Sequence, residues 1–217
     1  MNAIERPIRL SAPMVRAVLA GTKTQLRMPI GLPELRPSTT PGYAWTWRGQ
    51  APVRSVAQQR RHPTGCWQDV SGEKFLSLCP YGAPGDFLWA QETWCEGYPG
   101  TADPYLYRAT YEGGCDHKWR SSTSMPRRAS RLAFEVLSRR IVLLHAISEE
   151  DAWAEGIEKC DGMFGDAEIT RAALTAGVPV DDGRALYVAF WDATNGKIAP
   201  WASGPYVWVV NFRRVLS

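Results

Sequence analysis

Long apolar runs are missing from this chain of 217 residues. No stretch approaches the roughly 18 to 20 apolar residues that a membrane-spanning helix needs, and residues 1–13 lack the apolar centre of a secretion signal. A charge excess of one sign is missing too, because 25 Lys and Arg stand against 22 Asp and Glu, a net charge of +3. So small an excess argues against bulk electrostatic binding to nucleic acid or anionic membranes. We therefore expect a cytoplasmic protein with no membrane partner.

Cysteine and histidine are few and poorly spaced for chemistry. The five cysteines are odd in number and show no paired spacing, which is typical of reduced thiols. The three histidines have no recognisable nucleophile partner and no Gly-x-Ser-x-Gly elbow is present, so serine and cysteine hydrolase schemes have little support. Only His62 and Cys66 approach the spacing of two zinc ligands. We expect no metal and no organic cofactor.

Tryptophan, in contrast, is abundant, with ten Trp beside eight Tyr and six Phe. An excess of Trp beside Arg suits either core packing, its usual role, or a pocket that stacks a flat heterocycle. With 45% apolar and 22% charged residues the composition is that of a globular protein. The length predicts a single domain over residues 1–217. Turn-rich segments of poor periodicity predict insertions at about 29–75 and 95–130.

Periodicity and capping residues predict an α+β fold with mostly antiparallel strands in a small barrel. Apolar residues at helical spacing between Ser11 and Gly21 predict one short helix. Ser148, followed by three acidic residues, predicts the start of a helix that runs to about Glu155. The first insertion is interpreted as a lid or mobile loop with one strand near 43–47. Further strands are predicted at 86–92, 105–111, 132–137, 141–144 and 206–215, and further helices at 169–176 and 185–194.

Four segments occur in an informative order: LAGTKTQLR at 19–27, GDFLW at 85–89, ISEEDAWAEGI at 147–157 and VWVVNFRRV at 207–215. This set resembles the ASCH family, whose fold is similar to the PUA barrel, and it covers about half of the chain. The other half carries CPYG at 79–82, ETW at 92–94 and KWR at 118–120, and is similar to the longer ASCH proteins of phages and prophages. The resemblance implies a PUA-like, mostly antiparallel barrel with flanking helices and long loop insertions.

The resemblance also implies a metal-independent amidohydrolase that acts on N4-acylated cytosine or cytidine. The small N4-acetylcytidine amidohydrolases of this family use a lysine, a threonine and a glutamate in one pocket, and the lysine and glutamate fall on Lys23 and Glu155. Hydrolysis of this amide needs an activated nucleophile, charge stabilisation on the carbonyl oxygen and an acid for the leaving amine. Burial lowers the pKa of a lysine, whereas a close carboxylate raises it. We expect Lys23 and Glu155 to share one proton, held by either member.

The remaining family positions depart from the pattern. The family's threonine falls on Leu26, and the arginine two residues beyond it falls on Met28. A shift of one residue would bring Arg27 into the role of the arginine, with Thr24 or Thr22 supplying the hydroxyl. Three alternatives follow: catalysis without the threonine, loss of activity, or an alignment that slips by one.

A flat substrate ring gives the tryptophans a candidate role, because stacking on Trp is worth about 1 to 3 kcal/mol per base. Trp89, Trp94 and Trp119 are the candidates, with barrel packing an equal alternative for Trp89. Arg120 is expected to contact the substrate beside Trp119. The expected partner is a small nucleoside or nucleobase.

A second hypothesis is an RNA- or DNA-binding module, or an RNA-cleaving one. Arg127, Arg128 and Arg131 lie within five positions and are candidates for phosphate contacts, with a solvated surface loop as the plain alternative. An enzyme acting on free nucleosides predicts turnover with little salt dependence. A binding module predicts affinity that falls steeply with salt.

Overall fold

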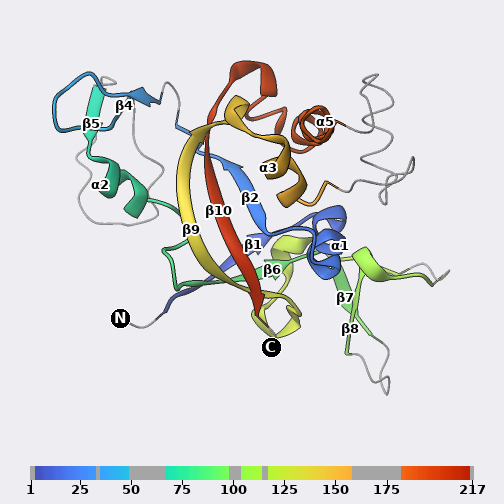
Figure 1. Cartoon of the computed structure of the whole chain (residues 1–217). Helices are drawn as coiled ribbons and strands as arrows, with labels where there is room; N and C mark the ends of the chain where they lie inside the picture. The colour runs from blue at the N-terminus through green and yellow to red at the C-terminus, as the bar shows by residue number, and fades with distance from the viewer. Residues whose placement is uncertain are drawn as a thin grey trace.

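A five-stranded sheet lies at the centre of the molecule (Figure 1). The computed structural model describes residues 3–32, 35–48, 67–97, 104–113, 117–157 and 182–215. Over these residues the fold is α+β, as predicted, with several mostly antiparallel sheets and few helices. The central sheet has the order β1 (Glu5–Arg9), β6 (Phe87–Gln91), β9 (Ala133–Leu143), β10 (Tyr206–Val215) and β2 (Gln25–Pro29).

The long pair β9 and β10 forms the middle of this sheet. Strand β10 is rich in β-branched and aromatic residues, which favour extended structure, and its predicted bounds are confirmed. It pairs antiparallel with β9 over its whole length, with a register shift between Asn211 and Phe212. The prediction of two strands at 132–137 and 141–144 is wrong, because β9 is one continuous strand that β10 holds in register.

The described strands do not close into a barrel. Strand β1 pairs only with β6, in parallel, and β2 pairs only with β10, so both are edges within the described part of the sheet. The helix α1 (Ala12–Ala20) connects these two edge strands along the chain. It starts with Pro13 in its first turn and ends at Gly21, whose φ of 81° is the left-handed conformation that glycine adopts without strain. This helix was predicted correctly.

The described part of the first insertion packs against the main core. It forms β3 (Arg36–Pro37), β4 (Trp45–Arg48) and β5 (Trp67–Val70), followed by α2 (Gly72–Ser77). The ring of Phe75 is fully buried and stacks on Trp208 of β10, with ring centroids 5.5 Å apart. The strand expected near 43–47 is confirmed as β4, while the interpretation of this region as a lid or mobile loop stays a prediction. Residues 49–66 lie outside the described residues.

Two further helices cover one side of the sheet. The helix α3 (Glu149–Ala154) starts where predicted, and the Ser148 hydroxyl accepts a hydrogen bond from the backbone N–H of Asp151 at 3.1 Å. It packs against α5 (Gly183–Asn195), which confirms the helix predicted at 185–194. The helix predicted at 169–176 lies outside the described residues. None of the helices in the described ranges has the length and apolarity needed to cross a membrane.

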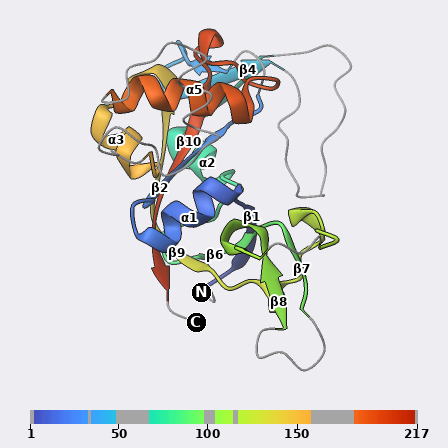
Figure 2. The ribbon, with the colours of Figure 1, turned by 90° about the vertical axis from the view of Figure 1, so that its right-hand side faces the viewer.

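The second insertion contains the hairpin of β7 (Trp94–Glu96) and β8 (Tyr105–Tyr107). The strand predicted at 105–111 is shorter than expected, because a 3-10 turn follows it. Figures 1 and 2 both place this hairpin on the side of α1 that faces away from α3. The 3-10 turns are Arg108–Thr110, Ser122–Ser124, Arg127–Ala129, Leu144–Ala146 and Trp201–Ser203.

Candidate active site

The end of α3 pairs with the segment that joins α1 to β2. Lys23 and Glu155 form an isolated antiparallel bridge, and the backbone N–H of Thr24 donates to the carbonyl of Ala154 at 2.9 Å. Gly156 makes this close approach possible: its φ is 89°, and a Cβ there would lie 2.6 Å from the Cβ of Ala17 and 3.0 Å from that of Lys23. The fold therefore brings together two residues that are 132 positions apart in the sequence.

The Lys23 ammonium group is buried and its hydrogen bonds are complete. Its Nζ donates to Oε2 of Glu155 at 2.9 Å, to the carbonyl oxygen of Glu155 at 2.7 Å and to that of Gln25 at 2.8 Å. An ammonium group has three N–H donors, so each finds an acceptor. The Lys23 and Glu155 side chains are 0% and 1% exposed. This is a buried ion pair rather than the solvated contact typical of surface lysines.

Arg27 of β2 completes the surroundings of the Glu155 carboxylate. Its Nη1 donates to Oε1 of Glu155 at 3.1 Å and also to the side-chain oxygen of Gln25. Its Nη2 donates to Oδ2 of Asp151 at 2.6 Å. Each oxygen of Glu155 therefore contacts one cation, Lys23 on one side and Arg27 on the other.

Asp151 and Gln25 extend this network toward solvent. The Gln25 amide donates to Oδ1 of Asp151 at 3.0 Å and to Oδ1 of Asn211 at 2.9 Å, while Arg140 approaches Asp151 at 3.3 Å. Side-chain exposure rises from 1% at Arg27 to 25% at Asp151 and 40% at Arg140. The network thus runs inward from a partly exposed aspartate to the buried lysine.

The sequence prediction missed Gln25, Asp151 and Arg140. A signal for the first was present, because Gln25 lies between Lys23 and Arg27 at the two-residue spacing that places side chains on one face of a strand. Asp151 lies four residues before Glu155, one helical turn away. Both positions could have been predicted by asking which neighbours of Lys23 and Glu155 share a face of the same strand or helix.

Burial and charge shift the titrating groups of this site. Burial lowers the pKa of Lys23 more than the neighbouring Glu155 charge raises it, so this pKa lies below its ordinary value. The buried Tyr187 of α5 has a pKa well above its ordinary value, because of burial first and of the Glu155 charge second. Burial acts to raise the pKa of Asp151, but the Gln25 hydrogen bond and the charges of Arg27 and Arg140 lower it overall.

Strand alternation decides which β2 residues join this site. Leu26 is 1% exposed and belongs to the apolar core, and Met28 packs against that core. Arg27 is therefore the arginine that lies beside Glu155. Thr24 is exposed, and the Thr22 hydroxyl donates to the carbonyl of Ala17 at 3.1 Å. Neither hydroxyl has a hydrogen bond to the ion pair among the described contacts, so the catalytic role of Thr24 stays a prediction.

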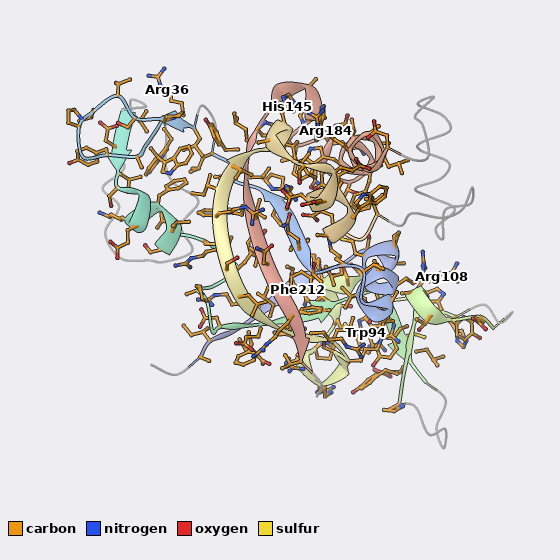
Figure 3. All side chains as sticks on the ribbon, viewed as in Figure 1. Arg36, Trp94, Arg108, His145, Arg184 and Phe212 are labelled. Carbon is orange, nitrogen blue, oxygen red and sulfur yellow. The ribbon has the colours of Figure 1, made fainter. Side chains whose placement is uncertain are left out.

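The candidate tryptophans lie in other parts of the molecule. Trp94 is buried in a separate apolar cluster with Met125 and Ala129. Arg120 lies over the Trp94 ring at 5.1 Å and pairs with Glu96. Figure 3 shows Trp94 and Arg108 beside the hairpin, on the far side of α1 from α3.

The other two tryptophans pack against arginines of their own neighbourhood. Trp119 is half-buried, with the Arg108 guanidinium 5.5 Å from its ring centre. Trp89 of β6 is half-buried, with Arg127 6.0 Å from its ring centre, and β9 and β10 separate β6 from β2 in the sheet. No described contact joins any of the three tryptophans, or Arg120, to the Lys23 and Glu155 pair.

The arginine cluster proposed for phosphate contacts is largely paired. Arg127 makes two hydrogen bonds to the Glu5 carboxylate, at 2.7 and 2.9 Å. Arg131 makes two to the buried Glu92 carboxylate, at 2.9 and 3.0 Å. The remaining member, Arg128, donates to the Tyr105 hydroxyl at 3.3 Å. Two of the three positive charges are thus neutralised by fixed carboxylates.

A half-open cavity of about 480 Å³ lies at the opposite end of β2 from Lys23. Its walls include Ile30, Leu35, Ile198 and Tyr206, and neither member of the ion pair lines it. Within the described ranges no three His, Cys, Asp or Glu side chains gather closely enough to ligate a metal ion. Cys79 and Cys95 are free and buried, whereas His62 and Cys66 lie outside the described residues.

Comparison with known proteins found no relative of this chain. No protein-family model, no curated protein and no solved structure matches the chain. The description of the site therefore rests on the contacts given above.

Proposed function

We propose that this chain is a metal-independent amidohydrolase that removes the acyl group from N4-acylated cytosine or cytidine. The observation that carries the proposal is the 2.9 Å contact between Lys23 and Glu155, two side chains that are at most 1% exposed. They are the two residues to which the ASCH resemblance assigns catalysis. We also propose that the fold is PUA-like, on the basis of the mostly antiparallel central sheet and of α1 between its edge strands.

The pair suits proton transfer because burial and the neighbouring charge act on Lys23 in opposite directions. Burial disfavours the charged lysine, while the carboxylate at 2.9 Å stabilises it. When the proton passes from Nζ to Glu155, the neutral amine of Lys23 is free to accept a proton from an attacking water. The water oxygen bonds to the acyl carbon, the bond from this carbon to N4 breaks, and Glu155 delivers its proton to N4. General acid–base catalysis of this kind contributes typically about 10²- to 10⁴-fold in rate.

The nucleic-acid alternative has less support in the structure. A phosphate-binding cluster needs free positive charge, and Glu5 and Glu92 already occupy Arg127 and Arg131. No contact among the described residues favours this second function over hydrolysis, so we propose hydrolysis alone.

The test is incubation of the purified full chain with N4-acetylcytidine, followed by chromatographic measurement of cytidine and acetate. Glu155→Gln keeps the size of the side chain but cannot carry the proton, so we expect turnover at least about 100-fold slower. Glu73→Gln is the matched control, because Glu73 is an exposed residue of α2, and it should retain the wild-type rate. Absence of cytidine with the wild-type chain, or equal rates for Glu155→Gln and Glu73→Gln, would overturn the proposal.

A further inference from the structure

One donor of the buried network has no acceptor. The Nε of Arg27 is buried and has no hydrogen-bond partner among the described residues. The whole Arg27 side chain is 1% exposed, so solvent does not supply a partner either. The other two nitrogens of this guanidinium are occupied by Gln25, Glu155 and Asp151. A buried N–H without a partner costs free energy, and such groups in native proteins call for an explanation. The position of Arg27 beside Glu155 supports one explanation: the Nε–H donates to an oxygen atom of a bound ligand.

We infer that Arg27 Nε is the donor that binds the acyl carbonyl oxygen of the substrate and stabilises the negative charge that develops on it. This inference rests on the proposed function and assigns one role within it. Amide hydrolysis needs such a donor, because attack by water turns the carbonyl oxygen into an oxyanion.

Arg27 Nε is assigned this role because the other donors described in the site already have acceptors. The Lys23 ammonium group already donates to three acceptors, and two of them are backbone carbonyls that cannot move away independently of the fold. Both hydrogens of the Gln25 amide are taken by Asp151 and Asn211. The Nε–H of Arg27 lies in the same guanidinium that contacts Glu155, so a carbonyl bound there sits beside the proton-transfer pair.

The partners of Arg27 hold this donor in a fixed direction. A guanidinium is planar, and contacts from Nη1 to Glu155 and from Nη2 to Asp151 on different groups fix its plane. A donor that needs no reorganisation during the reaction is the kind that stabilises an oxyanion best.

The experiment compares oxygen and sulfur in the substrate. N4-acetylcytidine and N4-thioacetylcytidine are each incubated with the wild-type chain, with Arg27→Lys and with the control Arg9→Lys. Arg9 is an exposed arginine of β1. Sulfur accepts hydrogen bonds poorly, so the thioacetyl substrate loses the contribution of the donor while the rest of the site is unchanged. We expect Arg27→Lys to lower kcat for the acetyl substrate by about 10²- to 10³-fold. We expect its oxygen-to-sulfur rate ratio to fall by a similar factor relative to the wild type and Arg9→Lys.

The outcomes separate the two proposals. A wild-type chain that hydrolyses neither substrate overturns the proposed function and this assignment with it. A wild-type chain that is active, beside an Arg27→Lys variant with an unchanged kcat or an unchanged oxygen-to-sulfur ratio, overturns the assignment alone, because a merely structural arginine slows both substrates equally.

A measurement on a chain that retains Arg27 keeps the assignment testable if Arg27→Lys does not fold. The infrared stretch of a ¹³C-labelled carbonyl in N4-acetylcytidine is recorded in complex with the slow variant Glu155→Gln. A hydrogen bond from Arg27 weakens the C=O bond, so we expect the band at lower frequency than for the free compound in water. A bound carbonyl at the frequency of the free compound or above it would overturn the assignment.

Discussion

Replacement of Lys23 by methionine tests whether the buried ion pair is as strongly coupled as its geometry indicates. The change removes a fully buried ammonium group and leaves Oε2 of Glu155 and two backbone carbonyls without their donor, while Arg27 keeps its contact with Oε1. Removal of one partner from a buried pair costs about 3 to 5 kcal/mol, which is a large share of the 5 to 15 kcal/mol that typically stabilises a domain. We therefore expect the free energy of unfolding to fall by about 3 to 5 kcal/mol in Lys23→Met.

The double variant Lys23→Met/Glu155→Gln separates the pair from its individual members. With the carboxylate neutralised as well, the buried position of Glu155 carries no charge, and Asp151 remains as the carboxylate partner of Arg27. We expect its loss of stability to be smaller than the sum of the two single losses by about 1 to 3 kcal/mol, the range seen for residues in direct contact. Neither replacement side chain carries a proton that can be transferred, so under the proposed mechanism the double variant should fold and be inactive.

Urea unfolding followed by tryptophan fluorescence measures these free energies, because the chain contains ten Trp. Lys74→Met is the matched control, since Lys74 is an exposed residue of α2, and it should leave the unfolding midpoint almost unchanged. Single losses that add without coupling, or a Lys23→Met midpoint equal to that of Lys74→Met, would refute the reasoning.

Three further predictions concern pH and salt. The pKa of Lys23 is lowered in the folded chain, so between that value and the ordinary 10.5 the unfolded chain binds more protons than the folded chain. The free energy of unfolding should therefore rise with pH in this window. Urea titrations at several pH values should show a smaller rise for Lys23→Met. The pKa of Asp151 is also lowered, so its stabilising contribution is present above the ordinary 3.8 and is lost as the pH falls through the folded value. Thermal unfolding measured as the pH falls between these two values should therefore show a shallower acid loss in Asp151→Asn, and an acid loss as steep as that of the wild type would contradict this. Finally, Arg127 and Arg131 are already paired with carboxylates, so RNA affinity should not depend strongly on salt. Fluorescence anisotropy with labelled RNA should show no steep decline in affinity between about 50 and 200 mM salt. A decline of about 10³-fold would favour the nucleic-acid hypothesis.

Local signals account for the elements that the sequence predicted well. Gly21 ends α1, Ser148 starts α3, and the β-branched run of β10 forms a strand with the predicted bounds. Each of these features acts within a few residues of chain. The continuous strand β9 was missed because the polar residues Ser138 and Arg139 interrupt its apolar pattern, whereas pairing with β10 extends it across them.

Distant contacts account for what the sequence did not show. Gln25 is buried because its amide bonds Asp151 and Asn211, which are 126 and 186 positions away, and no local pattern reveals such partners. The Lys23 and Glu155 pair could be anticipated only through the resemblance to the ASCH family. The packing of Phe75 against β10 likewise depends on tertiary contacts, so the turn-rich composition of the first insertion was a poor guide to its burial.

The glycine that follows Glu155 gives this site a vulnerability that its charges do not reveal. At Gly156 a single added methyl group would meet Ala17 and Lys23 at once, wedging α1 away from the end of α3. The close approach of Lys23 to Glu155 thus depends on the absence of a side chain at position 156. We expect alanine at this one position to move Lys23 away from Glu155 while leaving every titratable residue in place.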